Sequence, residues 1–191
     1  MPQLLCEFQA RNPAVRVALE VHDTQAVVDR VAERELELGI VGAARRRRGV
    51  RFEAFFRDEV VLACPPGHRF AGRTVTVDEL RSEPLIVMQE GAGVRQVLED
   101  ELRRLGARLR DLDVPLTLGL QESVRSAVVG GYGVSFISRT AVEADLASGA
   151  IAEARVEGMD GGRQIWLAQA TGRTPTRAAD EFVSFARDRL A

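Results

Sequence analysis

Three places in the sequence join an apolar stretch to the first turn of a predicted helix that carries hydroxyl groups or glycines. They are Asp23-Thr24-Gln25, Gly91-Ala92-Gly93-Val94-Arg95 and Glu122-Ser123-Val124. The first turn of a helix offers unpaired N–H groups and the positive end of the helix dipole, so it attracts carboxylates and inorganic anions. Each segment alone is better explained by plain capping or by a turn at the glycines. Together, however, the three predict an anion-binding pocket.

The same sequence offers little for catalysis. His22 and His68 are its two histidines, and no HExxH, GxSxG or CxxC pattern accompanies them. The glycines at 91 and 93 match neither a phosphate loop nor a dinucleotide fingerprint. His68 lies in a Pro-Gly-His turn, and Cys6 and Cys64 sit far apart among apolar neighbours, so we expect a structural histidine and two core cysteines. We therefore predict neither an enzyme nor a metal site, and no cofactor.

Charge and hydropathy narrow the class of protein further. Lys and Arg total 26 against 28 Asp and Glu, a formal net charge of -2, which argues against DNA binding by this chain alone. The run Arg45–Arg48 can be interpreted as a phosphate contact or as a solvated loop, and the loop is favoured because no aromatic residues interleave. No segment has the length of a membrane span and no secretion signal opens the chain, so we expect a cytoplasmic protein without membrane contact.

The order of elements favours an α/β fold. The periodicity predicts a helix over 2–11, a strand over 15–21, a helix from 23 or 24 to 34 and a strand over 36–41. Further strands are predicted at 60–64, 85–88, 116–120, 134–137 and 165–168, and further helices at 77–80, 94–105, 124–129 and 177–190. Alternating strands and helices with short links predict a mainly parallel sheet covered by helices.

Several segments of the sequence match one known family in residue type, order and spacing. The longer ones are Asp58–His68 (DEVVLACPPGH), Glu83–Arg95 (EPLIVMQEGAGVR) and Glu122–Ser138 (ESVRSAVVGGYGVSFIS). On these segments, the sequence resembles the effector-binding domain of LysR-type transcription regulators over nearly its whole length. Pro2–Phe8 with Asn12-Pro13 resembles the family's first helix and turn, and Leu36–Val41 resembles a strand that usually carries aspartate at the position of Glu37.

The resemblance implies a fold like the type II periplasmic binding proteins, with two Rossmann-like lobes, a central cleft and crossing hinge strands. Lobe I would comprise residues 1–63 and 139–191, and lobe II residues 64–138. Matching the family's cleft to this sequence and adding the neighbouring polar side chains gives the candidate ligand-binding residues Thr24, Gln25, Ala92, Gly93, Arg95, Ser123, Ser135 and Phe136.

The resemblance also implies a function. The chain would bind a small effector, and a homodimer or homotetramer of the full regulator would rearrange in response through the first helix and the helix of 94–105. DNA would be contacted only through a helix-turn-helix domain, which is absent from these residues together with the family's first strand. Related domains often carry Ser and Thr where this chain has Ala92 and Val94, and the donors that remain favour an anionic effector. A solute-binding protein of the same fold is the alternative.

Overall fold

The computed structural model describes residues 2–172 and 174–190. The chain forms two compact units: unit 1 combines the chain up to Phe56 with the chain from Gln164 onward, and unit 2 runs from Arg57 to Arg163. The return to unit 1 comes later than the predicted position between residues 138 and 139. The difference arises because α6 (Arg139–Ser148) and β7 (Ala152–Val156) pack on strands of unit 2.

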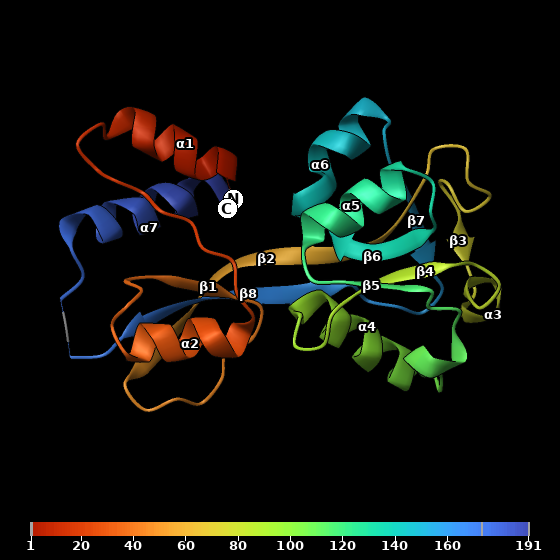
Figure 1. Cartoon of the computed structure of the whole chain (residues 1–191), viewed down its shortest axis with the longest axis horizontal. Coiled ribbons are helices and arrows are strands. Elements are labelled where there is room, and N and C mark those ends of the chain that lie inside the picture. Colours follow the sequence, from red (N-terminus) through yellow and green to blue (C-terminus); the bar gives the residue numbers. More distant parts are fainter. Residues whose placement is uncertain (1, 173, 191) are drawn as a thin grey trace. The chain divides into compact units, whose positions relative to one another are not determined.

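Unit 2 is built on a mixed sheet. The strand order is β3-β7-β2-β6-β4-β5; β2 is antiparallel to β6 and β7, whereas β4 is parallel to β5 and β6. Helices α5 and α6 cover one face of this sheet and α4 covers the other (Figure 1). Besides α6 and β7, the elements are β2 (Val50–Cys64, which begins in unit 1), β3 (Thr74–Val75), α3 (Val77–Leu80), β4 (Leu85–Met88), α4 (Gly93–Arg104), a 3-10 turn (Leu109–Asp111), β5 (Leu116–Leu118), α5 (Gln121–Val129) and β6 (Val134–Ser138).

The core of unit 2 follows from uninterrupted apolar runs. All four residues of β4 are buried, as are all five of β6 and the last five of β2. Strands covered on both faces need such runs, which is why the strands predicted over 60–64, 85–88 and 134–137 agree closely with the structure. Helix α4 completes the core with Val94, Leu98 and Leu102, which are spaced four residues apart on one side of the helix.

A buried ion pair joins the two ends of unit 2. The side chain of Asp58 is 2% exposed and that of Arg163 11%. Arg163 donates from Nε and Nη2 to Asp58 Oδ2 at 2.8 and 2.6 Å, and the hydroxyls of Ser138 and Thr140 donate to Oδ1 at 2.8 and 3.2 Å. The buried carboxylate is thus compensated both in charge and in hydrogen bonds.

The backbone makes a close approach beside this ion pair. A Cβ atom on Gly161 would lie 2.0 Å from the carbonyl oxygen of Val60, and the Val60 N–H donates to the Gly161 carbonyl at 2.8 Å. Only a residue without a side chain fits this contact.

Unit 1 has two smaller apolar clusters. In the first, Phe8 packs edge to face on Phe182, with ring centroids 5.3 Å apart. In the second, the buried valines of the second helix pack against Val41 and Ala168. The elements are α1 (Pro2–Arg11), α2 (Thr24–Ala32), β1 (Gly39–Val41), the first part of β2, most of β8 (Gly162–Ala170), to which β1 is antiparallel, and α7 (Arg177–Leu190).

The strand predicted for residues 15–21 is wrong. No strand forms there, and the apolar side chains of Val17, Leu19 and Val21 are 39%, 53% and 68% exposed. An alternating pattern becomes a strand only where another strand supplies hydrogen-bond partners, and no strand in the described part of the chain pairs with this segment. The alternating pattern alone therefore predicted a strand wrongly here, because it carries no information about a partner strand.

Other predictions differ in smaller ways. Residues 50–59 of β2, the two-residue strand β3, α6 and β7 had no counterpart in the sequence prediction. The prediction of two core cysteines holds for Cys64 and is wrong for Cys6, which is exposed on α1. Burial raises the pKa of the Cys64 thiol from 9.0 to about 11, so it is protonated at neutral pH. Among residues 2–172 and 174–190, no helix is both long and apolar enough to cross a bilayer.

Candidate functional site

The strongest candidate site lies where α4 and α5 begin. Strands β4 and β5 are parallel, with Met88 opposite Leu118, so their carboxyl ends meet at one edge of the sheet of unit 2. Residues 89–93 lead from β4 into α4 and residues 119–123 lead from β5 into α5; we call these two segments the α4/α5 edge. In open parallel sheets, ligands bind at this edge because successive helix N-termini point toward it.

The two segments of the α4/α5 edge are held together by short contacts. The Gln89 N–H donates to the Leu118 carbonyl at 2.9 Å. The side chain of Gln89 also passes close to Gly119, where an added Cβ would lie 2.9 Å from Gln89 Oε1. The starts of α4 and α5 are therefore positioned relative to each other by the sheet and by this contact.

Neither helix has a side-chain cap. Ala92 and Leu120 occupy the N-cap positions of α4 and α5, and neither has a side chain that accepts a backbone hydrogen bond. By contrast, α2 is capped by Asp23, whose carboxylate accepts from Ala26 N at 2.9 Å, and α3 has a capping box at Thr76. The N–H groups of Ala92 and Ser123 donate to the carbonyls of Gln89 and Leu120 at 3.3 and 3.1 Å. The other first-turn N–H groups of α4 and α5 are available for a ligand, together with the positive ends of both helix dipoles.

Three of the predicted ligand residues belong to this edge. Ala92 and Gly93 stand at the start of α4, and Ser123 is the third residue of α5 and is exposed. The expectation that Ser123 caps its helix is wrong, because α5 begins at Gln121, earlier than predicted. Its hydroxyl therefore remains free of a capping role.

Arg95 is the third residue of α4, and its side chain is 17% exposed. It donates from Nε to Glu99 at 2.8 Å, approaches Glu90 at 3.5 Å and reaches back to the Met88 carbonyl at 3.4 Å. Two carboxylates thus compensate its charge. Arg95 contributes cationic character next to the edge but is engaged by its own helix.

The Oε1 atom of Gln121 is buried and has no hydrogen-bond partner. It is the one such side-chain oxygen or nitrogen among the described residues. It stands at the first position of α5, inside the α4/α5 edge. Sequence reasoning missed Gln89, Gly119 and Gln121. The rule that ligands bind just beyond the carboxyl ends of parallel strands would have found them, since they follow Met88 and Leu118 directly.

Ser135 and Phe136 lie within β6 and not at the α4/α5 edge. Ser135 is fully buried, and its hydroxyl donates to the Ile86 carbonyl at 2.7 Å. Phe136 is 7% exposed and lines a separate pocket of unit 2. The structure therefore does not bring these two residues together with Ala92, Gly93 and Ser123.

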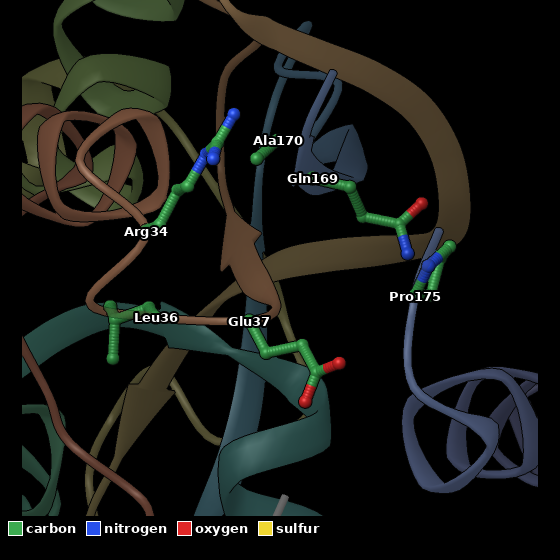
Figure 2. A pocket seen from close by; sticks show the side chains of 6 residues that line it. All are labelled: Arg34, Leu36, Glu37, Gln169, Ala170 and Pro175. Carbon is green, nitrogen blue, oxygen red and sulfur yellow. The ribbon is translucent and has the colours of Figure 1, made fainter. Parts of the chain in front are cut away.

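The remaining predicted residues, Thr24 and Gln25, belong to unit 1. They form the first turn of α2, which Asp23 already caps, and Gln25 donates to Asp29 at 3.0 Å. Unit 1 also has a small pocket of about 20 Å³ beside Arg34 and Gln169 (Figure 2). The backbone of Arg34 has a positive φ of 67°. The volume of the pocket suits about one water molecule, so it is too small for an effector.

No group of three or more His, Cys, Asp or Glu in the described parts of the chain has an arrangement that would hold a metal ion. His68 has a structural environment, as predicted: its Nε2 atom lies 3.1 Å from Glu83 and its ring packs on Phe70. The Arg45–Arg48 loop is exposed, and Arg47 pairs with Asp29 at 2.9 Å.

Comparison with known families agrees with this architecture. Residues 1–191 match the family described as the LysR substrate binding domain. The chain belongs to this family. The resemblance inferred from the DEVVLACPPGH, EPLIVMQEGAGVR and ESVRSAVVGGYGVSFIS segments is confirmed, and with it the fold like the type II periplasmic binding proteins.

This LysR substrate-binding domain has relatives among longer proteins. The "RuBisCO operon transcriptional regulator" of Allochromatium vinosum is 29% identical over 185 residues, which are 96% of this chain and 60% of that protein. A protein of Anaeromyxobacter dehalogenans (strain 2CP-C) with the name "Phosphonates import ATP-binding protein PhnC" is 34% identical over 187 residues, 98% of this chain and 38% of that protein. The chain spans less than two thirds of either relative.

A solved structure shows the same fold. The Synechocystis PCC6803 CcmR regulatory domain, in complex with 2-PG, is similar to this LysR substrate-binding domain with a TM-score of 0.83 and 22% identity. The alignment covers 99% of this chain and 90% of that chain. The chain is thus a LysR substrate-binding domain with this fold, and the solute-binding alternative is not favoured.

Proposed function

We propose that this LysR substrate-binding domain senses a small anionic effector and that the α4/α5 edge supplies a main part of its binding site. The observation that carries the proposal is the pair of helices, α4 and α5, that begin side by side at one sheet edge without side-chain caps. The first-turn N–H groups that have no backbone acceptor, among them those of Gly93, Val94 and Gln121, favour an acceptor-rich ligand.

The chemistry of the edge favours a carboxylate or a phosphoryl group. Both helix dipoles place partial positive charge there, and Ser123 adds a hydroxyl. Arg95 lies beside the edge, but Glu90 and Glu99 compensate its charge. Thr24 and Gln25, in the first turn of α2, remain predictions from the sequence.

In the full regulator, the effector would act by favouring one arrangement of a homodimer or homotetramer. A ligand can shift such an equilibrium only through its difference in affinity for the two states, typically about 1–3 kcal/mol. DNA contact would come from a helix-turn-helix domain outside these residues. Binding of a small molecule by the similar CcmR domain supports the proposal.

The test is a thermal melt of this chain with inorganic phosphate, methylphosphonate, glycolate or shikimate at fixed pH and ionic strength. A ligand at about 100 times its dissociation constant adds roughly 2.7 kcal/mol to the free energy of unfolding. We expect at least one anion to raise the melting temperature, and a neutral analogue, ethylene glycol, to leave it unchanged.

Two matched variants locate the effect. Ser123→Glu places a carboxylate at the α4/α5 edge and should abolish the shift through repulsion. Ser126→Glu introduces the same charge at another exposed position of α5, further from its start, and should preserve the shift. If both variants keep the shift, or if no anion produces one, the α4/α5 edge is not the effector site.

A further inference from the structure

A second pocket lies inside unit 2, away from the α4/α5 edge. It has a volume of about 430 Å³, within the range of roughly 300–1,000 Å³ typical of small-molecule sites. One wall is α4, another is the turn that follows β7 (residues 157–161), and the floor is formed by the neighbouring strands β6, β2 and β7. We call it the α4/β7 pocket.

The floor of the α4/β7 pocket is apolar. Leu62 and Phe136 face each other across the β2–β6 register and are 2% and 7% exposed, and Leu98 of α4 is 3% exposed. Val97 and Met159 are half-buried at the sides. This lining suits the alkyl or aryl body of a small molecule.

Two hydrogen bonds join the walls of the pocket. The Glu101 carboxylate on α4 accepts a hydrogen bond from Asp160 N at 2.7 Å, and Arg104 donates to the Gly158 carbonyl. The hydrogen bond from Arg104, which lies 2.5 Å from Glu101, lowers the pKa of the Glu101 carboxyl, so Glu101 stays ionised at neutral pH. The turn at 157–161 is therefore held against α4 before any ligand arrives.

The rim is acidic. Five carboxylates and one guanidinium, that of Arg155, line the pocket, and the carboxylates are Glu59, Glu101, Glu153, Glu157 and Asp160. Arg139 pairs with Glu59 and Glu153, and Arg104 pairs with Glu101. Glu157 and Asp160 have no ion-pair partner among the residues that the structure describes. Arg155 lines the pocket as well and also has no ion pair among the described residues. Five carboxylates against the three guanidiniums of Arg104, Arg139 and Arg155 leave an excess of about two negative charges around an apolar pocket.

We propose that the α4/β7 pocket binds a small organic cation, an ammonium group on an alkyl or aryl body, with the ammonium beside Glu157 and Asp160 and the body against Leu62, Phe136 and Met159. Its ligand is opposite in charge to the one proposed for the α4/α5 edge. The domain would then respond to two chemically different molecules, and either proposal can fail without the other.

The test uses 2-phenylethylamine as the cation, with 2-phenylethanol and phenylacetate as neutral and anionic controls of similar shape. With [methyl-¹³C]methionine, the Met159 methyl reports on the pocket, and the Met88 methyl, buried in β4, reports on the rest of unit 2. We expect a saturable shift of the Met159 signal with the amine, a much smaller one with the controls, and an unmoved Met88 signal.

A pair of charge variants completes the test. Glu157→Gln with Asp160→Asn should weaken amine binding about tenfold, while Glu143→Gln, at an exposed position of α6 outside the pocket, should leave it unchanged. The proposal is overturned if Met159 does not respond, if phenylacetate shifts it equally, or if the double variant binds the amine normally. A Met159 shift that follows protein concentration alone would assign the pocket to a second copy of the chain and would also overturn it.

Discussion

At the scale of single residues, Asp58 illustrates what sequence reasoning can and cannot reach. Its place in the DEVVLACPPGH segment was recognised, but not its partner, because Arg163 lies 105 positions away and no local pattern joins them. The same limit applies to Gln121, whose buried Oε1 atom becomes notable only once the surrounding backbone is known. Ala92, Gly93 and Ser123 could be predicted because a helix start is a local feature.

Asp58→Asn should lower the free energy of unfolding by about 3–5 kcal/mol, because it leaves the guanidinium of Arg163 buried without a compensating charge. Urea unfolding followed by circular dichroism measures the change. Asp78→Asn is the control: Asp78 is 83% exposed and pairs with Arg81 on the surface, so its removal should cost less than about 1 kcal/mol. Equal effects of the two substitutions would contradict a structural role for the Asp58 ion pair.

At the scale of elements, the sequence predicted the bounds of a helix or strand well where the apolar pattern of that segment alone was sufficient. The buried strand β4 and the helices α1, α3 and α7 lie where their apolar periodicity predicts. The prediction failed where a strand forms only if a neighbouring strand supplies hydrogen-bond partners. The two-residue strand β3 exists because β7 offers parallel partners, and residues 15–21 remain without a strand because none is offered.

Gly161→Ala tests the close approach of the β7–β8 connection to β2. An added Cβ would lie 2.0 Å from the Val60 carbonyl oxygen, so the backbone must move and the hydrogen bond from Val60 N is lost. We expect a loss of about 1–3 kcal/mol in a thermal or urea melt. Gly67→Ala, with nothing within 4 Å, should stay within about 0.5 kcal/mol. If Gly161→Ala is equally harmless, the contact is not a constraint.

At the scale of the whole molecule, the two units differ in how the chain builds them. Unit 2 is one continuous segment, Arg57–Arg163, with a single large apolar cluster, whereas unit 1 needs both ends of the chain and has two smaller clusters. The predicted division at 64–138 was drawn from sequence similarity alone. It leaves out α6 and β7, which contact β6, α5 and β2.

Residues 57–163 should therefore fold when produced alone, with a cooperative melt and the circular dichroism of a mixed α/β protein. The Asp58–Arg163 ion pair would tie its ends together. Residues 64–138 should not fold when produced alone, because they lack β2, β7 and that ion pair. A cooperative melt of the shorter segment, or none from the longer, would show that the unit boundaries lie elsewhere.

The segment before α2 has a thermodynamic consequence. The alternate residues Val17, Leu19 and Val21 have exposed apolar side chains. Three large hydrocarbon groups are therefore in contact with water. Water around apolar surface raises the heat capacity of the system. Any association that covers these side chains removes that water and therefore lowers the heat capacity. The heat-capacity change of such an association would be negative, and its sign would distinguish coverage of this segment from purely ionic contacts made elsewhere on the domain.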